Sequence, residues 1–92
     1  MEKNNYRIFF SKTAVKDKNN LIKAGLYNNC CELLDKMMMD PFFYPPSYEK
    51  LVGDLKGFYS RRINRQHRLV YKVDVKKMEI YIYRMWTHYD KF

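Results

Sequence analysis

The sequence predicts an α+β fold in which two helices pack on one face of a twisted, mainly antiparallel sheet, in the order β-α-α-β-β-β. Apolar residues recur at three- and four-residue steps twice in the first half of the chain, which is typical of two helices. Three β-rich segments with short polar links follow in the second half. With 92 residues, of which 47% are hydrophobic, we expect one domain spanning residues 1–92.

The first strand and helix are indicated by a short apolar run and a capping residue. The run "YRIFF", residues 6–10, is aromatic and β-branched, as a strand requires. Ser11 then offers a helix N-cap. The residues expected on the buried face of this helix are Ala14, Val15, Lys18, Leu21 and Ile22.

The second helix is marked more clearly, because its apolar pattern runs to Met37 and Pro41 ends it. Cys30 and Cys31 lie within this pattern as adjacent residues, which cannot easily form a disulfide with each other. We therefore expect them to pack in the helix, in a protein from a reducing compartment.

The segment "DPFFYPPSYEKLVGD", residues 40–54, is expected to be a loop that Pro45 and Pro46 hold extended and rigid. Glu49 follows immediately after its "PPSY". Strands are expected at about residues 56–64, 67–75 and 78–86. The short polar links between them indicate an antiparallel meander.

Alternation along the strand at residues 67–75 predicts which side chains face the helices. Arg68 and Val70 point to one face, and the more apolar set points to the other: His67, Leu69, Tyr71 and Val73. The apolar set belongs under the helices, so Arg68 is expected on the open face. We expect that face to present arginines to solvent on a concave surface lined with aromatic rings.

The charge is unevenly distributed along the chain. Residues 1–55 hold eight Lys and Arg against seven Asp and Glu, whereas residues 56–92 hold ten against three. The two parts therefore carry net charges of +1 and +7, and such asymmetry indicates a polyanionic partner, most often nucleic acid. A surface that is basic only for solubility would spread its charge and prefer Lys, whereas residues 55–73 prefer Arg.

Several classes of protein are not indicated. No apolar run of about 18 residues is present and the start "MEKNNYRIFF" lacks the core of a signal peptide, so we expect a cytoplasmic protein with no membrane partner. No glycine-rich phosphate loop occurs. The two His are 21 residues apart and the two Cys are adjacent, so no metal or other cofactor is expected.

The remaining polar residues suit metal-free cleavage of an RNA phosphodiester. This reaction needs a base for the 2′-hydroxyl, a fixed cation for the charge on phosphorus and an acid for the departing 5′-oxygen. Glu49, an arginine and His88 can fill these roles. Simpler interpretations remain open: Glu49 as one half of a surface ion pair, His88 as a chain-end residue without a role, and His67 as a hydrogen-bonded structural residue.

Two stretches of the sequence, "PPSYEKLVGDLKGFYSRRINRQHRLVYKV" and "RMWTHY", resemble the YoeB/Txe group of bacterial toxins, in the RelE superfamily of type II toxin–antitoxin systems. The segments cover about half of the chain, and the compatible order of elements extends the resemblance over nearly all of it. The resemblance implies a ribosome-dependent mRNA endonuclease, an mRNA interferase, that cuts messages in the ribosomal A site. It also implies a cognate YefM/Axe-like antitoxin that covers the site, and a possible homodimer.

Carried over by motif, the resemblance makes Glu49 the general base, Arg68 the residue that stabilises the transition state and His88 the general acid. It makes Arg62 a ligand of the scissile phosphate, and Tyr89 a residue that stacks on or orients the substrate.

Arg61 and Arg65 belong to the same basic stretch and are expected to contact RNA, ribosomal RNA included. The chain departs from the pattern at two places. Tyr59 stands where many relatives have Trp, and Asp90 follows the terminal "HY" at which many relatives end. A carboxylate at position 90 is expected to favour the charged form of the His88 imidazole.

Two other functions fit the composition. A basic RNA- or ribosome-binding module without catalysis would bind with the same steep dependence on salt. A basic subunit whose only task is to hold an acidic protein would copurify with its partner, as a toxin does with its antitoxin. Cleavage products, rather than binding, separate these functions from an endonuclease.

Overall fold

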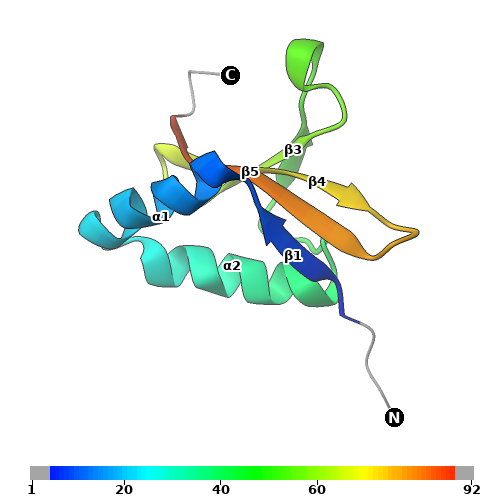
Figure 1. The fold of residues 1–92 in the computed structure, drawn as a ribbon, viewed down its shortest axis with the longest axis horizontal. Coiled ribbons are helices and arrows are strands. Elements are labelled where there is room, and N and C mark those ends of the chain that lie inside the picture. Colours follow the sequence, from blue (N-terminus) through cyan, green and yellow to red (C-terminus); the bar gives the residue numbers. More distant parts are fainter. Residues whose placement is uncertain (1–4, 89–92) are drawn as a thin grey trace.

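The computed structural model describes residues 5–88, with the side chain of His88 left out. Its elements are β1 (Arg7–Phe10), α1 (Lys12–Lys23), α2 (Tyr27–Met39), β2 (Tyr48–Lys50), the short 3-10 turn η1 (Gly53–Leu55), β3 (Tyr59–Arg62), β4 (His67–Asp74) and β5 (Glu79–His88). Both helices lie on the same side of the sheet (Figure 1). No helix among the described residues is long and apolar enough to span a bilayer.

The sheet has the strand order β1-β5-β4-β3-β2. Only β1 and β5 pair in parallel, and the other neighbours are antiparallel. The predicted α+β class and meander are confirmed, but the sheet has one strand more than expected. Residues 40–54 are not all loop, because Tyr48–Lys50 form β2 at the edge beside β3.

Ser11 caps α1 as predicted, since its Oγ accepts a hydrogen bond from the Ala14 N–H at 3.0 Å. The buried face of this helix differs from the prediction. Val15 and Ile22 are half exposed, at 56% and 51%, whereas Asp17 is buried at 4%. A buried carboxylate in a helix that packs on a sheet requires a specific partner.

The partner of Asp17 is the part of β5 that has no neighbouring strand on one side. The ladder between β1 and β5 runs only from Glu79 to Ile82 on β5, so the following residues have no strand on that side. Asp17 Oδ2 accepts a hydrogen bond from the Met85 N–H at 2.9 Å and another from Arg84 Nε at 3.0 Å. The Asp17 carboxylate therefore takes the place of a neighbouring strand at this edge, which explains why α1 points the face that carries Asp17 toward β5.

The core lies between the helices and the face of β4 that alternation assigned to it. Leu69 and Tyr71 are fully buried there, with Ile80 and Ile82 from β5 beside them. The predicted orientation of β4 is therefore confirmed, and Arg68 points away from the helices.

Burial of Tyr71 predicts how stability depends on alkaline pH. Burial raises the pKa of its hydroxyl from 10.0 to about 12. In the unfolded chain the group loses its proton from about pH 10, while the folded state keeps it, so the free energy of unfolding falls as pH rises from about 10 to 12. In Tyr71→Phe this fall is expected to be smaller, by about 2–3 kcal/mol over the window. Urea titrations at a series of pH values measure it.

The matched control is Tyr44→Phe, because Tyr44 is 75% exposed. Its unfolding free energy is expected to fall with pH as steeply as that of the parent. Equal slopes for the parent and Tyr71→Phe would contradict the prediction.

Candidate active site

Three adjacent strands bring Glu49, Ser60 and Arg68 together on the open face of the sheet. Glu49 of β2 pairs with Ser60 of β3, and Ser60 in turn lies opposite Val70 of β4. Arg68 Nη1 donates to Glu49 Oε1 at 3.0 Å and to Ser60 Oγ at 2.9 Å. The cluster therefore contains a carboxylate and a guanidinium close together, and these are two of the groups that metal-free phosphodiester cleavage uses.

The two charged groups of this cluster differ in their access to solvent. The side chain of Arg68 is 4% exposed and that of Glu49 is 57% exposed. The expectation that Arg68 is presented to solvent is wrong, because β2 carries Glu49 across it. A guanidinium held from below by a buried hydroxyl loses little side-chain freedom when it binds an anion. The interpretation of Glu49 as one half of an ion pair is confirmed, and its role as a general base stays a prediction.

The last strand brings further predicted residues toward this cluster. Thr87 pairs with Arg68, and His88 pairs with His67 at the end of the β4–β5 ladder. The side chain of His88 and the whole of Tyr89 lie outside the described residues. His67 is 6% exposed and stacks on Trp86, with ring centroids 3.8 Å apart, which fits its structural interpretation.

The other predicted RNA contacts are divided between the surface and the core. Arg62 is exposed and pairs with Arg68 in the β3–β4 ladder, and Arg65 is exposed in the turn that follows β3. Both residues are exposed where β3 leads into β4, so their side chains are accessible to a polyanion. Arg62 also borders a shallow groove beside α2.

Arg61 does not face RNA in this structure, because it is 0% exposed. Its guanidinium donates to three backbone oxygens: Pro46 O at 2.6 Å, Phe43 O at 2.7 Å and Pro41 O at 3.2 Å. The RNA contact predicted for Arg61 is therefore wrong. Adjacent residues of a strand point to opposite faces, so Arg62 stays outside while Arg61 enters the core.

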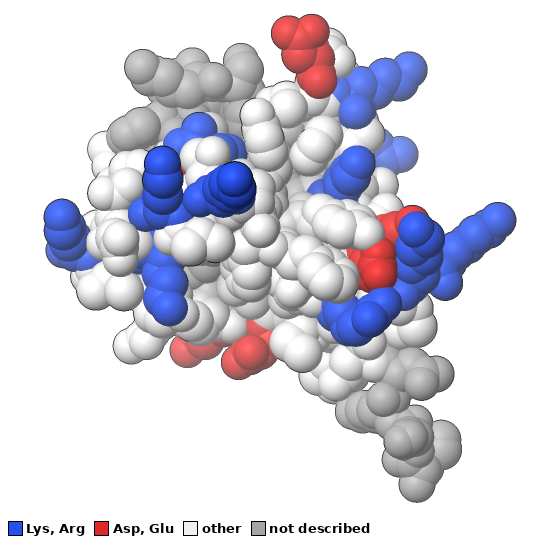
Figure 2. All heavy atoms as spheres, viewed as in Figure 1, with Lys and Arg blue, Asp and Glu red and all other residues white. Residues whose placement is uncertain are grey.

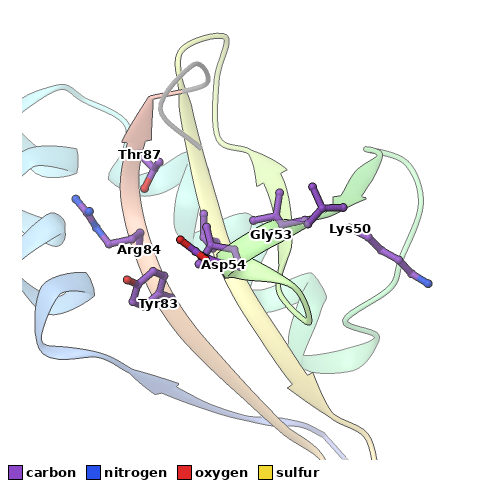
Figure 3. Close-up of a pocket in the computed structure, with 10 residues that line it drawn as sticks. Lys50, Gly53, Asp54, Tyr83, Arg84 and Thr87 are labelled. Atoms are coloured by element: carbon purple, nitrogen blue, oxygen red, sulfur yellow. The ribbon is translucent and has the colours of Figure 1, made fainter.

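A cleft of about 630 Å³ separates residues 50–55 from β4 and β5. Glu49 and Arg68 do not line it, but Lys50, which follows Glu49, and Thr87, which pairs with Arg68, do. Figure 3 shows Asp54 on the turn side and Tyr83 and Thr87 on the β5 side, while the charged ends of Lys50 and Arg84 point away from the space between. Its lining residues are Lys50, Leu51, Val52, Gly53, Asp54, Leu55, Val70, Tyr83, Arg84 and Thr87. Asp54 and Thr87 could not be predicted as cleft residues, because segments far apart in the sequence come together to form the cleft.

Exposed basic side chains are not confined to the second half of the sequence. Figure 2 shows them on both sides of a mainly uncharged band, over α1 and around the β4–β5 hairpin. The exposed lysines of these two regions are Lys12, Lys16, Lys18 and Lys23 on α1, and Lys72, Lys76 and Lys77 on the hairpin. Within residues 5–88, no three His, Cys, Asp or Glu residues gather in a way that could hold a metal ion.

The profile of the family described as "YoeB-like toxin of bacterial type II toxin-antitoxin system" matches residues 10–89. The chain belongs to this family. Toxin YoeB of Streptomyces coelicolor is 50% identical over 40 residues, which are 44% of this chain and 48% of that protein. Toxin YoeB of Synechocystis sp. is 37% identical over 59 residues, 64% of this chain and 66% of that one. The match to the Streptomyces relative thus spans about half of that protein's length.

Solved structures of YoeB toxins resemble this fold over almost their whole length. The YoeB dimer from Staphylococcus aureus has a TM-score of 0.76 and 34% identity, covering 91% of this chain and 98% of that one. The YoeB–YefM complex from the same organism matches equally well. The YoeB/ParE toxin from Agrobacterium tumefaciens has a TM-score of 0.79 and 25% identity, with 90% and 99% covered. This YoeB-like toxin therefore shares its two helices and five-stranded sheet with them.

Proposed function

We propose that this YoeB-like toxin is a ribosome-dependent mRNA endonuclease that cleaves messages in the ribosomal A site. The contact between Glu49 and Arg68 is the observation that carries the proposal, and their neighbours Lys50 and Thr87 line an open cleft. A general base next to a cation is the minimum that cleavage through the 2′-hydroxyl requires, and no metal ion has to take part.

Glu49 takes the proton from the 2′-hydroxyl of the nucleotide before the cut, and the 2′-oxygen attacks phosphorus. Arg68 binds the phosphate oxygens, on which negative charge grows as the new bond forms. His88 gives a proton to the 5′-oxygen as the bond between phosphorus and that oxygen breaks. The products are a 2′,3′-cyclic phosphate and a free 5′-hydroxyl.

The site supports the order of these steps. Glu49 is exposed to the solvent from which substrate comes, so its carboxylate is accessible to a hydroxyl. Because Glu49 lies across the 4% exposed Arg68 side chain, a phosphate reaches the guanidinium by displacing the carboxylate from Arg68 Nη1, and it then lies beside Glu49. The exposed Arg62 and Arg65 bind neighbouring phosphates, and Tyr89 stacks on or orients a base.

The exposed lysines of α1 and of the β4–β5 hairpin, which lie outside the site, bind ribosomal RNA. This binding weakens as the salt concentration rises. A protein antitoxin of the YefM/Axe type neutralises the toxin in the cytoplasm by covering the site. The solved YoeB–YefM complex and YoeB dimer of Staphylococcus aureus support both this partner and a homodimer for the present chain.

The experiment is primer extension on one mRNA in a purified translation system, with antitoxin-free toxin and His88→Ala in parallel. We expect cuts only where ribosomes are present, and a cleavage rate in His88→Ala lower by about 10²- to 10⁴-fold, because the leaving 5′-oxygen loses its acid. A lane without ribosomes is the control. Intact message in every lane, from folded toxin, would favour an RNA-binding module without catalysis, and cuts without ribosomes would overturn the A-site mechanism.

A further inference from the structure

Arg61 is a fully buried arginine whose charge is balanced without a carboxylate. Its guanidinium carbon lies 4.0 Å from the centre of the Phe43 ring and 4.9 Å from that of Tyr48. Three carbonyl oxygens accept its hydrogen bonds, and none of the ion pairs formed within residues 5–88 includes it. Such a charge is costly to bury, and a packed apolar side chain would fill the same space at lower cost. A specific geometric task accounts for its presence.

All of these partners of Arg61 belong to one segment. The carbonyls are those of Pro41, Phe43 and Pro46, and the rings are those of Phe43 and Tyr48. Within the described residues this segment has no regular secondary structure until β2 begins at Tyr48. β2 itself has only three residues, so its own ladder holds it weakly.

The same segment leads directly to the candidate base. Tyr48 pairs with Arg61 in the β2–β3 ladder, and Glu49 is the next residue. Because side chains alternate along a strand, Tyr48 turns toward Arg61 on the helix side while Glu49 emerges on the open face beside Arg68. A displacement of the segment on the helix side would therefore move the Glu49 carboxylate relative to Arg68.

We propose that Arg61 is a positioning residue that holds residues 41–48 against the sheet and thereby fixes Glu49 next to Arg68. This inference rests on the proposed function, in which Glu49 is the general base. The planar fork of arginine is needed because one side chain must reach three carbonyls in different directions while its flat faces contact two rings. A lysine at this position offers a single point charge and cannot reproduce the arrangement.

The test uses Arg61→Met, which keeps an unbranched side chain of similar length without the guanidinium. Two quantities are measured in the full-length toxin: hydrogen exchange of the amides of residues 48–51, and the single-turnover rate of message cleavage on saturating ribosomes. We expect exchange at these amides to accelerate about tenfold or more relative to β4 and β5, since only local anchoring is lost. Cleavage is expected to slow on the order of 10- to 100-fold, while the toxin concentration that half-saturates ribosomes stays unchanged.

The control for a general loss of stability is Leu21→Ala, a fully buried position on α1. It is expected to accelerate exchange across the sheet without a preference for residues 48–51. Where Arg61→Met does not fold, Phe43→Leu replaces it, because this variant removes one ring face and leaves the guanidinium in place. It is expected to change both quantities in the same direction, by about threefold.

A double-mutant cycle decides whether Arg61 acts through Glu49. In the Glu49→Gln background, Arg61→Met is expected to slow cleavage by about threefold or less, because residues that act as a unit are not additive. The inference is overturned if Arg61→Met slows cleavage in the Glu49→Gln background as much as it does in the parent. It is also overturned if hydrogen exchange does not accelerate preferentially at residues 48–51. If instead Glu49→Gln cleaves at the parental rate, the role of Glu49 fails, while the exchange data still report whether Arg61 holds β2.

Discussion

Replacing Arg68 by alanine is expected to slow cleavage of ribosome-bound message by about 10³-fold. The guanidinium is 4% exposed and held by Glu49 and Ser60, so it is already oriented before substrate arrives. Arg68→Ala therefore removes the positive charge that contacts the candidate base, Glu49. The rate is measured by primer extension under single-turnover conditions, with circular dichroism to verify the fold.

Two variants separate the effect of the planar Arg68 guanidinium from the effect of its positive charge. Arg68→Lys keeps the charge and loses the fork, so we expect a rate between those of the parent and Arg68→Ala. Lys16→Ala removes an exposed positive charge from α1, so it is expected to bind ribosomes less tightly but to cleave at the parental single-turnover rate once ribosomes are saturating. Arg68→Ala that folds, binds ribosomes and still cleaves within about threefold of the parental rate would contradict the proposed role.

The placement of Arg68 could be predicted from sequence because it depends on local pattern. Strict alternation along residues 67–73 assigned Leu69 and Tyr71 to the core, and the structure buries both completely. The Ser11 cap is equally local, since the hydroxyl and the amide that it binds are three residues apart. Both features depend on short-range geometry that the sequence encodes directly.

β2 could not be predicted, because its three residues are too few to show any periodicity. It exists through pairing with β3, a contact between segments about ten residues apart that no propensity describes. This strand places Glu49 over Arg68 and forms one side of the cleft. The site is thus the part of the molecule that depends most on tertiary contacts.

Arg61 and Asp17 show a different reason why the sequence did not predict where a side chain lies. The charge of the "SRR" motif suggested that both arginines face RNA, although alternation requires adjacent residues to point in opposite directions. The burial of Asp17 could not be predicted from the pattern of apolar residues, because a carboxylate is rarely buried without a partner. Its partner, the Met85 amide at an unpaired strand edge, lies 68 residues away and is visible only in the folded chain.

Glu49→Gln is expected to slow cleavage by about 10²- to 10⁴-fold, the range that a general base contributes. Glutamine has the same size, and its carbonyl oxygen can accept the hydrogen bond from Arg68 that Glu49 Oε1 accepts at 3.0 Å. The fold and the orientation of Arg68 are therefore preserved, while the group that takes the proton from the 2′-hydroxyl is lost. Single-turnover cleavage is measured against pH, with ribosome binding measured separately.

The pH profile distinguishes a base from a structural partner of Arg68. In the parent, the rate is expected to rise with pH on the acidic side, as general-base catalysis requires, and Glu49→Gln is expected to lose this rise while it binds ribosomes normally. Lys50→Gln is the matched control, since it changes the next residue of β2, whose charged end points away from the cleft (Figure 3). If Glu49→Gln kept both the rate and the rise, the Glu49–Arg68 ion pair would serve only to orient Arg68. Another group would then have to accept the proton, and residues 41–48 would have no catalytic reason to be held by Arg61.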